Sequence, residues 1–266
     1  MNVLPSFDNF FFLEFTAFAV LGLAFGSFAS ALIHRVPSGQ SVLSSKDRSA
    51  CPHCGQVLKA RDLIPLFSWL LSKGRCRYCG AKLSMMYPLL EVTACILTLA
   101  VLLLYKGTSL AEQVVVAFSI PILLALFVID LQYKILPNVL VLLLAVLGVI
   151  RLVTVFIADM DIGNLMAFES GLGALVFGLV AWLMAFLMEK ALKKPAMGMG
   201  DVKFFAVAGL WLGISDLAAF CIFSGVLGVI LGLIWRKIHK DEAFPFGPAL
   251  IAAFFTLLLI DSSLFL

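Results

Sequence analysis

Residues 120–130 read Ile-Pro-Ile-Leu-Leu-Ala-Leu-Phe-Val-Ile-Asp, an apolar run that ends in the carboxylate of Asp130. Apolar runs of about 18 or more residues recur along the chain, and such runs are typical of helices that cross a membrane. Of the 266 residues, 62% are hydrophobic and 13% are charged. The charged fraction is about half that of a soluble domain. The sequence therefore predicts an all-α polytopic membrane protein.

We expect about eight transmembrane helices, because a helix of about 20 residues crosses the hydrocarbon layer. The first is expected to be a membrane span and not a removed signal peptide, because it is long and lacks a small-residue cleavage site. The predicted spans cover residues 10–33, 88–105, 112–131, 138–157, 169–189, 201–215, 217–235 and 247–265.

The basic residues gather in alternate connections between these spans, in stretches that begin near Arg35, Lys134, Lys190 and Arg236. Connections rich in Lys and Arg stay on the cytoplasmic side of a membrane. Both termini are therefore expected on the outer side, and Asp130 and Asp201 at the cytoplasmic edge. Arg151 lies inside a predicted span, where snorkelling of its side chain to the outer interface is the expected explanation.

The connection between the first two spans differs from the others in composition. It holds two Cys-x-x-Cys-Gly knuckles, residues 51–55 and 76–80. Two such knuckles supply the four thiolates of a tetrahedral Zn²⁺ site, and cytoplasmic thiols stay reduced. The sequence predicts a structural zinc ribbon in which the ligands leave no position open for chemistry. Its ligands are Cys51, Cys54, Cys76 and Cys79. We divide the chain into a first span (1–33), the ribbon loop (34–87) and a membrane domain (88–266).

Asp201 ends the sequence Gly198-Met199-Gly200-Asp201 and, like Asp130, lies where an apolar segment meets water. An ionisable side chain near bilayer depth costs several kcal/mol unless it is paired or hydrated, so both aspartates are functional candidates. Two carboxyl groups that share one proton can hydrolyse a peptide bond, one activating water and the other polarising the carbonyl. Gly198 and Gly200 let the backbone approach a substrate. We expect Asp130 and Asp201 to form a catalytic pair.

Each aspartate also has a structural interpretation. Asp201 can be a first-turn helix residue that the helix dipole favours, and Asp130 can pair with Lys134 at helical i, i+4 spacing. Two other classes of protein stay open. A transporter would use carboxylates as a proton relay and show repeats and mid-span charges, whereas Glu14 and Glu91 lie near span edges. A membrane-anchored zinc-ribbon adaptor would have no use for Gly-x-Gly-Asp.

Several further motifs follow one another along nearly the whole chain. They are Gly26-Ser27-Phe28, Ile33-His34-Arg35-Val36-Pro37, Pro65-Leu66-Phe67-Ser68-Trp69-Leu70, Gly74-Arg75, Tyr87-Pro88-Leu89-Leu90-Glu91, Asp130 with Leu136-Pro137-Asn138, Gly198-Met199-Gly200-Asp201-Val202-Lys203 and Pro245-Phe246-Gly247-Pro248. With the two cysteine knuckles, this order resembles the type IV prepilin leader peptidases. Asn138 departs from the pattern, because many members carry Asp there, and Ser30 stands where many carry Asn.

The resemblance implies an aspartic endopeptidase that cuts the basic leader from type IV prepilins or type II secretion pseudopilins. Asp130 and Asp201 match the two catalytic aspartates of the family. The resemblance places the enzyme in the bacterial inner membrane, with its active site at the cytoplasmic face. It also implies methylation of the new N-terminal residue with S-adenosylmethionine as the methyl donor. Asn138 removes a third acid that this family pattern would place near the pair.

The methyl-donor site is expected in the ribbon loop and its flanks, because no Gly-x-Gly-x-x-Gly occurs in a strand-turn-helix setting. Gly74, Arg75 and Glu91 are the candidates, although Glu91 can equally be an anchor at the membrane interface. Expected partners are the pilin precursor and the lipid bilayer, and no nucleic acid. The ribbon loop is net basic, so acids elsewhere or anionic lipids are expected to bind the basic leader. The candidate acids are Asp47, Asp62, Glu189, Asp241 and Glu242.

Overall fold

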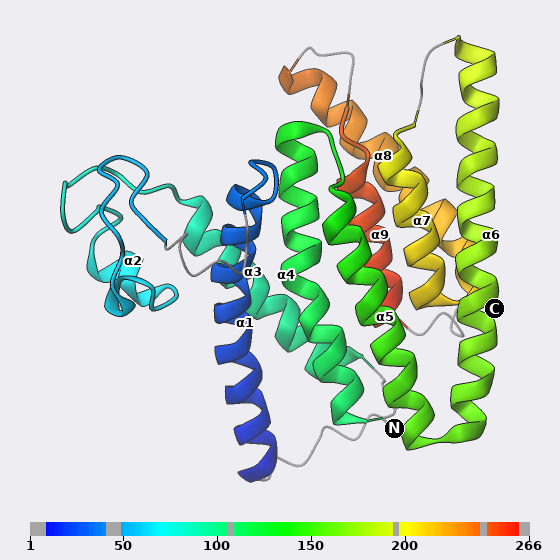
Figure 1. Cartoon of the computed structure of the whole chain (residues 1–266), viewed down its shortest axis with the longest axis horizontal. Helices are drawn as coiled ribbons and strands as arrows, with labels where there is room; N and C mark the ends of the chain where they lie inside the picture. Colours follow the sequence, from blue (N-terminus) through cyan, green and yellow to red (C-terminus); the bar gives the residue numbers. More distant parts are fainter. Residues whose placement is uncertain (1–8, 41–48, 106–108, 194–196, 240–243, 261–266) are drawn as a thin grey trace. The chain divides into compact units, whose positions relative to one another are not determined.

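The structure is a computed structural model that describes residues 9–40, 49–105, 109–193, 197–239 and 244–260. These residues form helices, two short 3-10 helices and two isolated β-bridges. The chain divides into two compact units, Met1–Leu103 and Leu104–Leu266 (Figure 1). The all-α prediction is therefore confirmed in the described residues.

The first unit contains two long apolar helices, α1 (Asn9–Arg35) and α3 (Met86–Leu104), with the cysteine-bearing segment between them. That segment carries the 3-10 helix η1 (Ala60–Asp62) and the short helix α2 (Phe67–Leu71). Glycines let α1 and α3 approach closely: a Cβ on Gly22 would lie 2.6 Å from the Cα of Cys95, and one on Gly26 would overlap the backbone of Glu91. Small residues four apart are typical of such close helix contacts in membranes.

The second unit is a helical bundle. Its helices are α4 (Leu110–Tyr133), α5 (Asn138–Ala158), α6 (Met160–Leu192), α7 (Met199–Leu212), the 3-10 helix η2 (Ile214–Asp216), α8 (Leu217–His239) and α9 (Gly247–Leu259). At least half of the residues of each of α4, α7 and α9 are buried. The ring of Phe254 on α9 meets those of Phe204 and Trp211 on α7 edge to face, at centroid distances of 5.8 and 6.0 Å. These three helices form the core of the bundle.

Eight apolar helices lie where the sequence predicts spans, but they differ in length. Six of those that the structure describes are long and apolar enough to cross a membrane, so the chain is a multi-pass membrane protein. The other two, α7 and α9, have 14 and 13 residues. At 1.5 Å per residue each rises about 20 Å, less than the ~30 Å hydrocarbon layer.

The helix boundaries follow local capping and not hydropathy alone. The helix α6 starts at Met160, upstream of the predicted residue 169, because Oδ1 of Asp159 accepts hydrogen bonds from the backbone nitrogens of Asp161 and Ile162, at 2.9 and 3.0 Å. Such an N-cap satisfies donors that a helix start otherwise leaves open. The helix α7 ends at Leu212, because Gly213 adopts a φ of 81°.

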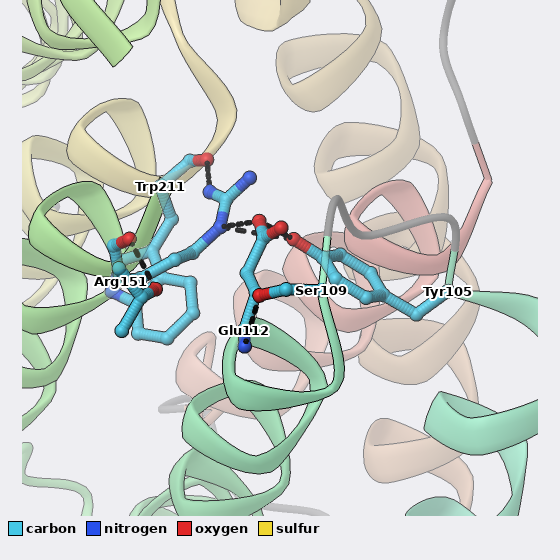
Figure 2. A network of polar contacts seen from close by, with 6 residues as sticks. Tyr105, Ser109, Glu112, Arg151 and Trp211 are labelled. Atoms are coloured by element: carbon cyan, nitrogen blue, oxygen red, sulfur yellow. Dashed lines mark hydrogen bonds and ion pairs between the residues drawn. The ribbon is translucent and has the colours of Figure 1, made fainter. Parts of the chain in front are cut away.

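The expectation that Arg151 snorkels to the outer interface is wrong, because its side chain is buried and makes the polar contacts drawn in Figure 2. Its Nε donates to Oε1 of Glu112 and to the hydroxyl of Tyr105, both at 2.9 Å, and its Nη1 donates to the carbonyl of Trp211 at 2.6 Å. The Tyr105 hydroxyl in turn donates to Glu112 at 2.5 Å. A buried charge needs such partners, since an unpaired one is costly. We call these four residues the Arg151 network.

Candidate functional site

Asp130 lies in the last turn of α4 and is 4% exposed. Its Oδ2 accepts a hydrogen bond from the backbone nitrogen of Gly247 at 2.9 Å. Gly247 is the first residue of α9, where free N–H groups and the helix dipole favour a negative charge. A Cβ on Gly247 would lie 2.6 Å from Oδ2 of Asp130. The carboxylate is therefore held directly at the start of α9, and only glycine leaves room for it.

Asp201 lies in the first turn of α7, as the sequence predicts. Its Oδ2 accepts a hydrogen bond from the backbone nitrogen of Gly198 at 3.2 Å. Gly198 is the N-cap residue of this helix. The side chain of Asp201 therefore folds back over the start of its own helix, and the helix dipole favours its anion.

Leu136, in the connection between α4 and α5, contacts the starts of both α7 and α9. A Cβ on Gly200 would lie 3.1 Å from the Cβ of Leu136, and a Cβ on Gly247 would lie 3.1 Å from its Cδ2. Gly200 precedes Asp201, and Gly247 binds Asp130. The structure thus brings the starts of α7 and α9, and with them the two aspartates, to one end of the second unit.

Lys203 and Asn138 link two helix starts at the same end. The Nζ of Lys203, in α7, donates to Oδ1 of Asn138, the first residue of α5, at 2.9 Å. Asn138 is the position where the resemblance noted above leads us to expect an acid in many members. An acid there would meet the ammonium group of Lys203, so the amide keeps the hydrogen bond and removes the negative charge.

Lys134 does not pair with the carboxylate of Asp130. In the described part of the chain, the ion pairs join Arg77 to Asp62 and Arg151 to Glu112. Lys134 instead ends α4 in a left-handed conformation, and its backbone nitrogen donates to the backbone carbonyl of Asp130 at 2.8 Å. The structural interpretation of Asp130 as the partner of Lys134 is therefore not supported.

The four predicted metal ligands form one cluster. The Sγ atoms of Cys51, Cys54, Cys76 and Cys79 all lie within 4.8 Å of one another. The Sγ atoms of Cys51 and Cys79 are 4.0 Å apart, and all four cysteines are free. A tetrahedral ion with Zn–S bonds of about 2.3 Å needs sulfur atoms about 3.8 Å apart. The cluster therefore fits a tetrahedral metal ion.

The two knuckles have the same backbone geometry. In each, the glycine nitrogen donates to the carbonyl of the first cysteine at 2.9 Å, from Gly55 to Cys51 and from Gly80 to Cys76. Both glycines have positive φ, 68° and 73°, which favours glycine. A single antiparallel bridge closes each knuckle, Ala50 with Val57 and Arg75 with Lys82. The two equivalent knuckles each present a pair of thiols, and the four thiols form one cluster.

Backbone hydrogen bonds prepare one of these thiols for a metal. The backbone N–H groups of His53 and Cys54 lower the pKa of the Cys51 thiol to about 6. A lowered pKa favours the thiolate, which is the form that binds metal.

The three candidates for methyl transfer lie in different surroundings. Gly74 has a φ of 66°, and a Cβ there would lie 2.7 Å from Cζ2 of Trp69. Arg75 is exposed next to it. Glu91 is buried, so it is not an exposed interface anchor; it accepts hydrogen bonds from the hydroxyl of Ser27 and from the backbone nitrogen of Leu66. Packing accounts for Gly74 and Glu91, and the assignment of all three to methyl transfer stays a prediction.

Of the acids considered for leader binding, Asp62 is already engaged. It accepts hydrogen bonds from the Tyr78 hydroxyl at 2.9 Å and the Lys59 nitrogen at 3.1 Å, and Arg77 lies 3.5 Å away. Burial opposes the charge, but these partners together lower the pKa of Asp62. Glu189 is exposed on α6. Asp47, Asp241 and Glu242 lie outside the described residues.

The fold and the site define a class of protein. It is a multi-pass helical membrane protein with two carboxyl groups at one end of a bundle and a four-thiol module between its first two spans. Two family profiles match the chain, "Bacterial Peptidase A24 N-terminal domain" over residues 20–105 and "Type IV leader peptidase family" over residues 117–233. No solved structure matches it significantly.

Curated relatives match almost the full chain. A "Prepilin leader peptidase/N-methyltransferase" of Pectobacterium carotovorum subsp. carotovorum is 33% identical over 88% of this chain and 88% of its own. A protein with the same name from Bacillus subtilis (strain 168) is 34% identical over 88% of this chain and 89% of its own. A "Type 4 prepilin-like proteins leader peptide-processing enzyme" of Escherichia coli O78:H11 is 34% identical over 86% and 87%. The chain belongs to the type IV leader peptidase family.

Sequence reasoning gave no role to Gly247, although Pro245-Phe246-Gly247-Pro248 was among the motifs. The available signal was the proline after the glycine, because proline is common in the first turn of a helix. That signal places Gly247 at a helix start but does not indicate which carboxylate meets it. The Arg151 network was missed for the same reason, since its partners come from distant parts of the sequence.

Proposed function

We propose that this chain cleaves the leader from type IV prepilins or type II secretion pseudopilins and then methylates the new N-terminal residue. Asp130 and Asp201 are its catalytic pair. The observation that carries this proposal is the placement of the two carboxyl groups at the starts of α9 and α7, at one end of the second unit. Family membership favours this activity over a transporter or an adaptor.

In the proposed reaction, one carboxylate removes a proton from a water molecule as the water oxygen attacks the carbonyl carbon of the scissile bond. The other carboxyl group, protonated, donates its proton to the carbonyl oxygen. As the C–N bond of the tetrahedral intermediate breaks, the first carboxyl group gives the proton it took from water to the amine of the mature pilin, and the diol oxygen returns a proton to the second carboxylate. Two neighbouring carboxyl groups favour the singly protonated state that this needs, because they titrate as a pair.

The backbone donors assist this pair. The Gly247 nitrogen fixes the orientation of the Asp130 carboxylate, and the start of α7 does the same for Asp201 through Gly198. Since both hydrogen bonds come from helix starts, the charge is stabilised without a neighbouring cation. The protonated carboxyl group can therefore donate its proton to the substrate carbonyl.

The site is proposed to lie at the cytoplasmic face of the inner membrane, with the ribbon loop on that side and both termini outside. The clustering of Lys and Arg in alternate connections supports this orientation. A prepilin carries an apolar helix after its basic leader, so its helix would dock laterally between spans. The scissile bond would then reach the level of Asp130 and Asp201.

The four thiols are proposed to hold one structural Zn²⁺, because their spacing suits a tetrahedral ion and all are free. For the methylation, S-adenosylmethionine would supply the methyl group to the new terminal amine. Gly74, Arg75 and Glu91 are proposed on the methyl-transfer side. Arg75 is the one of the three whose side chain is exposed and can approach a ligand.

The test uses the detergent-purified full chain and a prepilin, and follows leader loss and N-terminal mass separately. Asp130→Asn and Asp201→Asn should each abolish cleavage, because neither variant retains a proton-sharing pair. Both should still methylate a pilin that was cleaved beforehand. Asp161→Asn, an exposed acid in the first turn of α6, is the matched control and should cleave normally. Normal leader removal by either aspartate variant would falsify the pair.

A further inference from the structure

The ribbon loop exposes large apolar side chains on one short segment, residues 63–71. Leu63, Ile64, Phe67, Leu70 and Leu71 are 46% to 76% exposed. Phe67, Leu70 and Leu71 have i, i+3 and i+4 spacing, so they share one face of α2. A soluble surface rarely exposes so many large apolar groups together, and such a surface marks a binding site. We call these five residues the apolar face.

Hydrogen bonds hold the segment that carries the apolar face against α1 and α3, at a level between the ends of these helices. The backbone nitrogen of Leu66, in the middle of the segment, donates to Oε2 of Glu91 at 2.6 Å, and the Ser27 hydroxyl donates to Oε1. Glu91 lies within α3, which begins at Met86, and Ser27 lies within α1, which ends at Arg35. At 1.5 Å per residue these side chains sit about 7 to 12 Å from the helix ends.

This anchoring places α2 beside the membrane helices and not beyond their ends. In Figure 1, α2 is drawn lower than the C-terminal end of α1. The side chain of Leu89, in the first turn of α3, is 65% exposed. Since α1 and α3 are long and apolar enough to cross a membrane, a segment at this depth meets the same lipid leaflet.

A strained turn keeps the segment in this position. Leu66 has φ 60° and ψ −52°, and the backbone nitrogen of Phe67 donates to the carbonyl of Pro65 at 2.6 Å. Non-glycine residues rarely adopt this γ-turn conformation, so the surroundings must hold it. The Glu91 carboxylate does so by accepting the Leu66 N–H.

The rest of the ribbon is basic. In residues 49–85 the only acid is Asp62, which already binds Tyr78 and Arg77. The exposed basic residues of this stretch are Lys59, Arg61, Lys73, Arg75, Arg77 and Lys82. The net negative charge of four thiolates with one divalent ion would not cancel the positive charge of these residues. An apolar face with a basic surround matches a leaflet of anionic lipids, where acyl chains take the apolar groups and headgroups take the cations.

We propose that residues 63–71 are inserted in the cytoplasmic leaflet, with the apolar face among the acyl chains and the basic residues on anionic headgroups. The ribbon is then a membrane-docked module and not a free cytoplasmic loop. This goes beyond the peptidase and methyltransferase activities, because it does not depend on Asp130, Asp201 or a methyl donor.

The test places the photoreactive residue p-benzoylphenylalanine at Leu71 of the full chain, in nanodiscs of phosphatidylcholine and phosphatidylglycerol. His53, exposed on the first knuckle, is the matched control position. After illumination, mass spectrometry should find lipid acyl adducts at position 71, at a yield at least tenfold above that at position 53. Cross-links from position 71 to another part of the chain or to a second copy would overturn the proposal. Equal lipid yields at the two positions would overturn it too.

Two further measurements keep the outcome decisive. Metal content should be equal in both labelled proteins, and if position 71 disturbs the ribbon, the same label at Phe67 replaces it with the same expectation. In nanodiscs of phosphatidylcholine alone, the adduct yield should fall severalfold, because the headgroup attraction is lost. An unchanged yield would show that the basic residues do not bind anionic lipid and would overturn that part of the proposal.

Discussion

Gly247 donates its backbone N–H to Oδ2 of Asp130 at 2.9 Å across a sequence separation of 117 residues. The first residue of one core helix thereby fixes the carboxylate at the end of another. The same glycine has no space for a side chain, since a Cβ would lie 2.6 Å from that oxygen. The orientation of one proposed catalytic group therefore depends on a residue that carries no functional group of its own.

Gly247→Ala should lower the rate of leader cleavage about 100-fold, because the added methyl group displaces the Asp130 carboxylate. A displacement of about 1 Å is enough for a loss of that size. The initial rate of leader removal measures it. Gly225→Ala in α8, where a Cβ would meet open space, is the control and should cleave normally. Equal rates for the two variants would contradict the role assigned to Gly247.

Arg151→Met should lower the apparent melting temperature in detergent, because it leaves the buried Glu112 without its cation. Removing one partner of a buried ion pair costs about 3–5 kcal/mol. The double variant Arg151→Met/Glu112→Gln should recover part of the loss, since it also removes the uncompensated charge. If the stability lost in the double variant equals the sum of the losses in the two single variants, the two side chains do not stabilise each other. Arg151→Lys should not restore stability, because a lysine lacks the fork that reaches Glu112 and Trp211 together.

The cysteine cluster should hold one zinc ion per chain, which elemental analysis of protein purified without chelator measures. Cys76→Ser should lose the metal, whereas Cys221→Ser, in α8 outside the cluster, should keep it. Loss of metal should make residues 49–85 sensitive to protease, because metal-binding free energy is also folding free energy. Protein without zinc, or disulfides between the knuckles, would contradict this assignment.

Arg75→Ala should reduce methyl transfer more than cleavage, because its side chain is exposed on the ribbon while the aspartates lie in the second unit. Gly74→Ser should also impair methylation, but through distortion: its φ is 66°, and a side chain would collide with Trp69. Both activities are followed on one pilin substrate. A proportional loss of the two activities in Arg75→Ala would show that the ribbon positions the leader for cutting.

The sequence alone predicts the helices and the thiol cluster well, because both depend on local patterns. Apolar runs place eight helices, and Cys-x-x-Cys-Gly specifies each knuckle through a short backbone turn. Hydropathy was less informative about helix length: α6 is extended by the Asp159 cap, and α7 and α9 are shorter than a full span. Arg151 shows the limit of such patterns, since a lone charge in an apolar run looks the same whether it snorkels or is paired.

What the sequence determined by itself is thus the membrane class, the positions of the helices, the thiol knuckles and the two aspartates as candidates. Only the tertiary structure decided the partners of the buried polar groups. Gly247 meets Asp130, Arg151 meets Glu112, and Glu91 meets Leu66, across separations of 117, 39 and 25 residues. The physical reason is that a buried charge or an open helix end must be satisfied, but several residues in the sequence can satisfy it. Packing of the helices selects which one does.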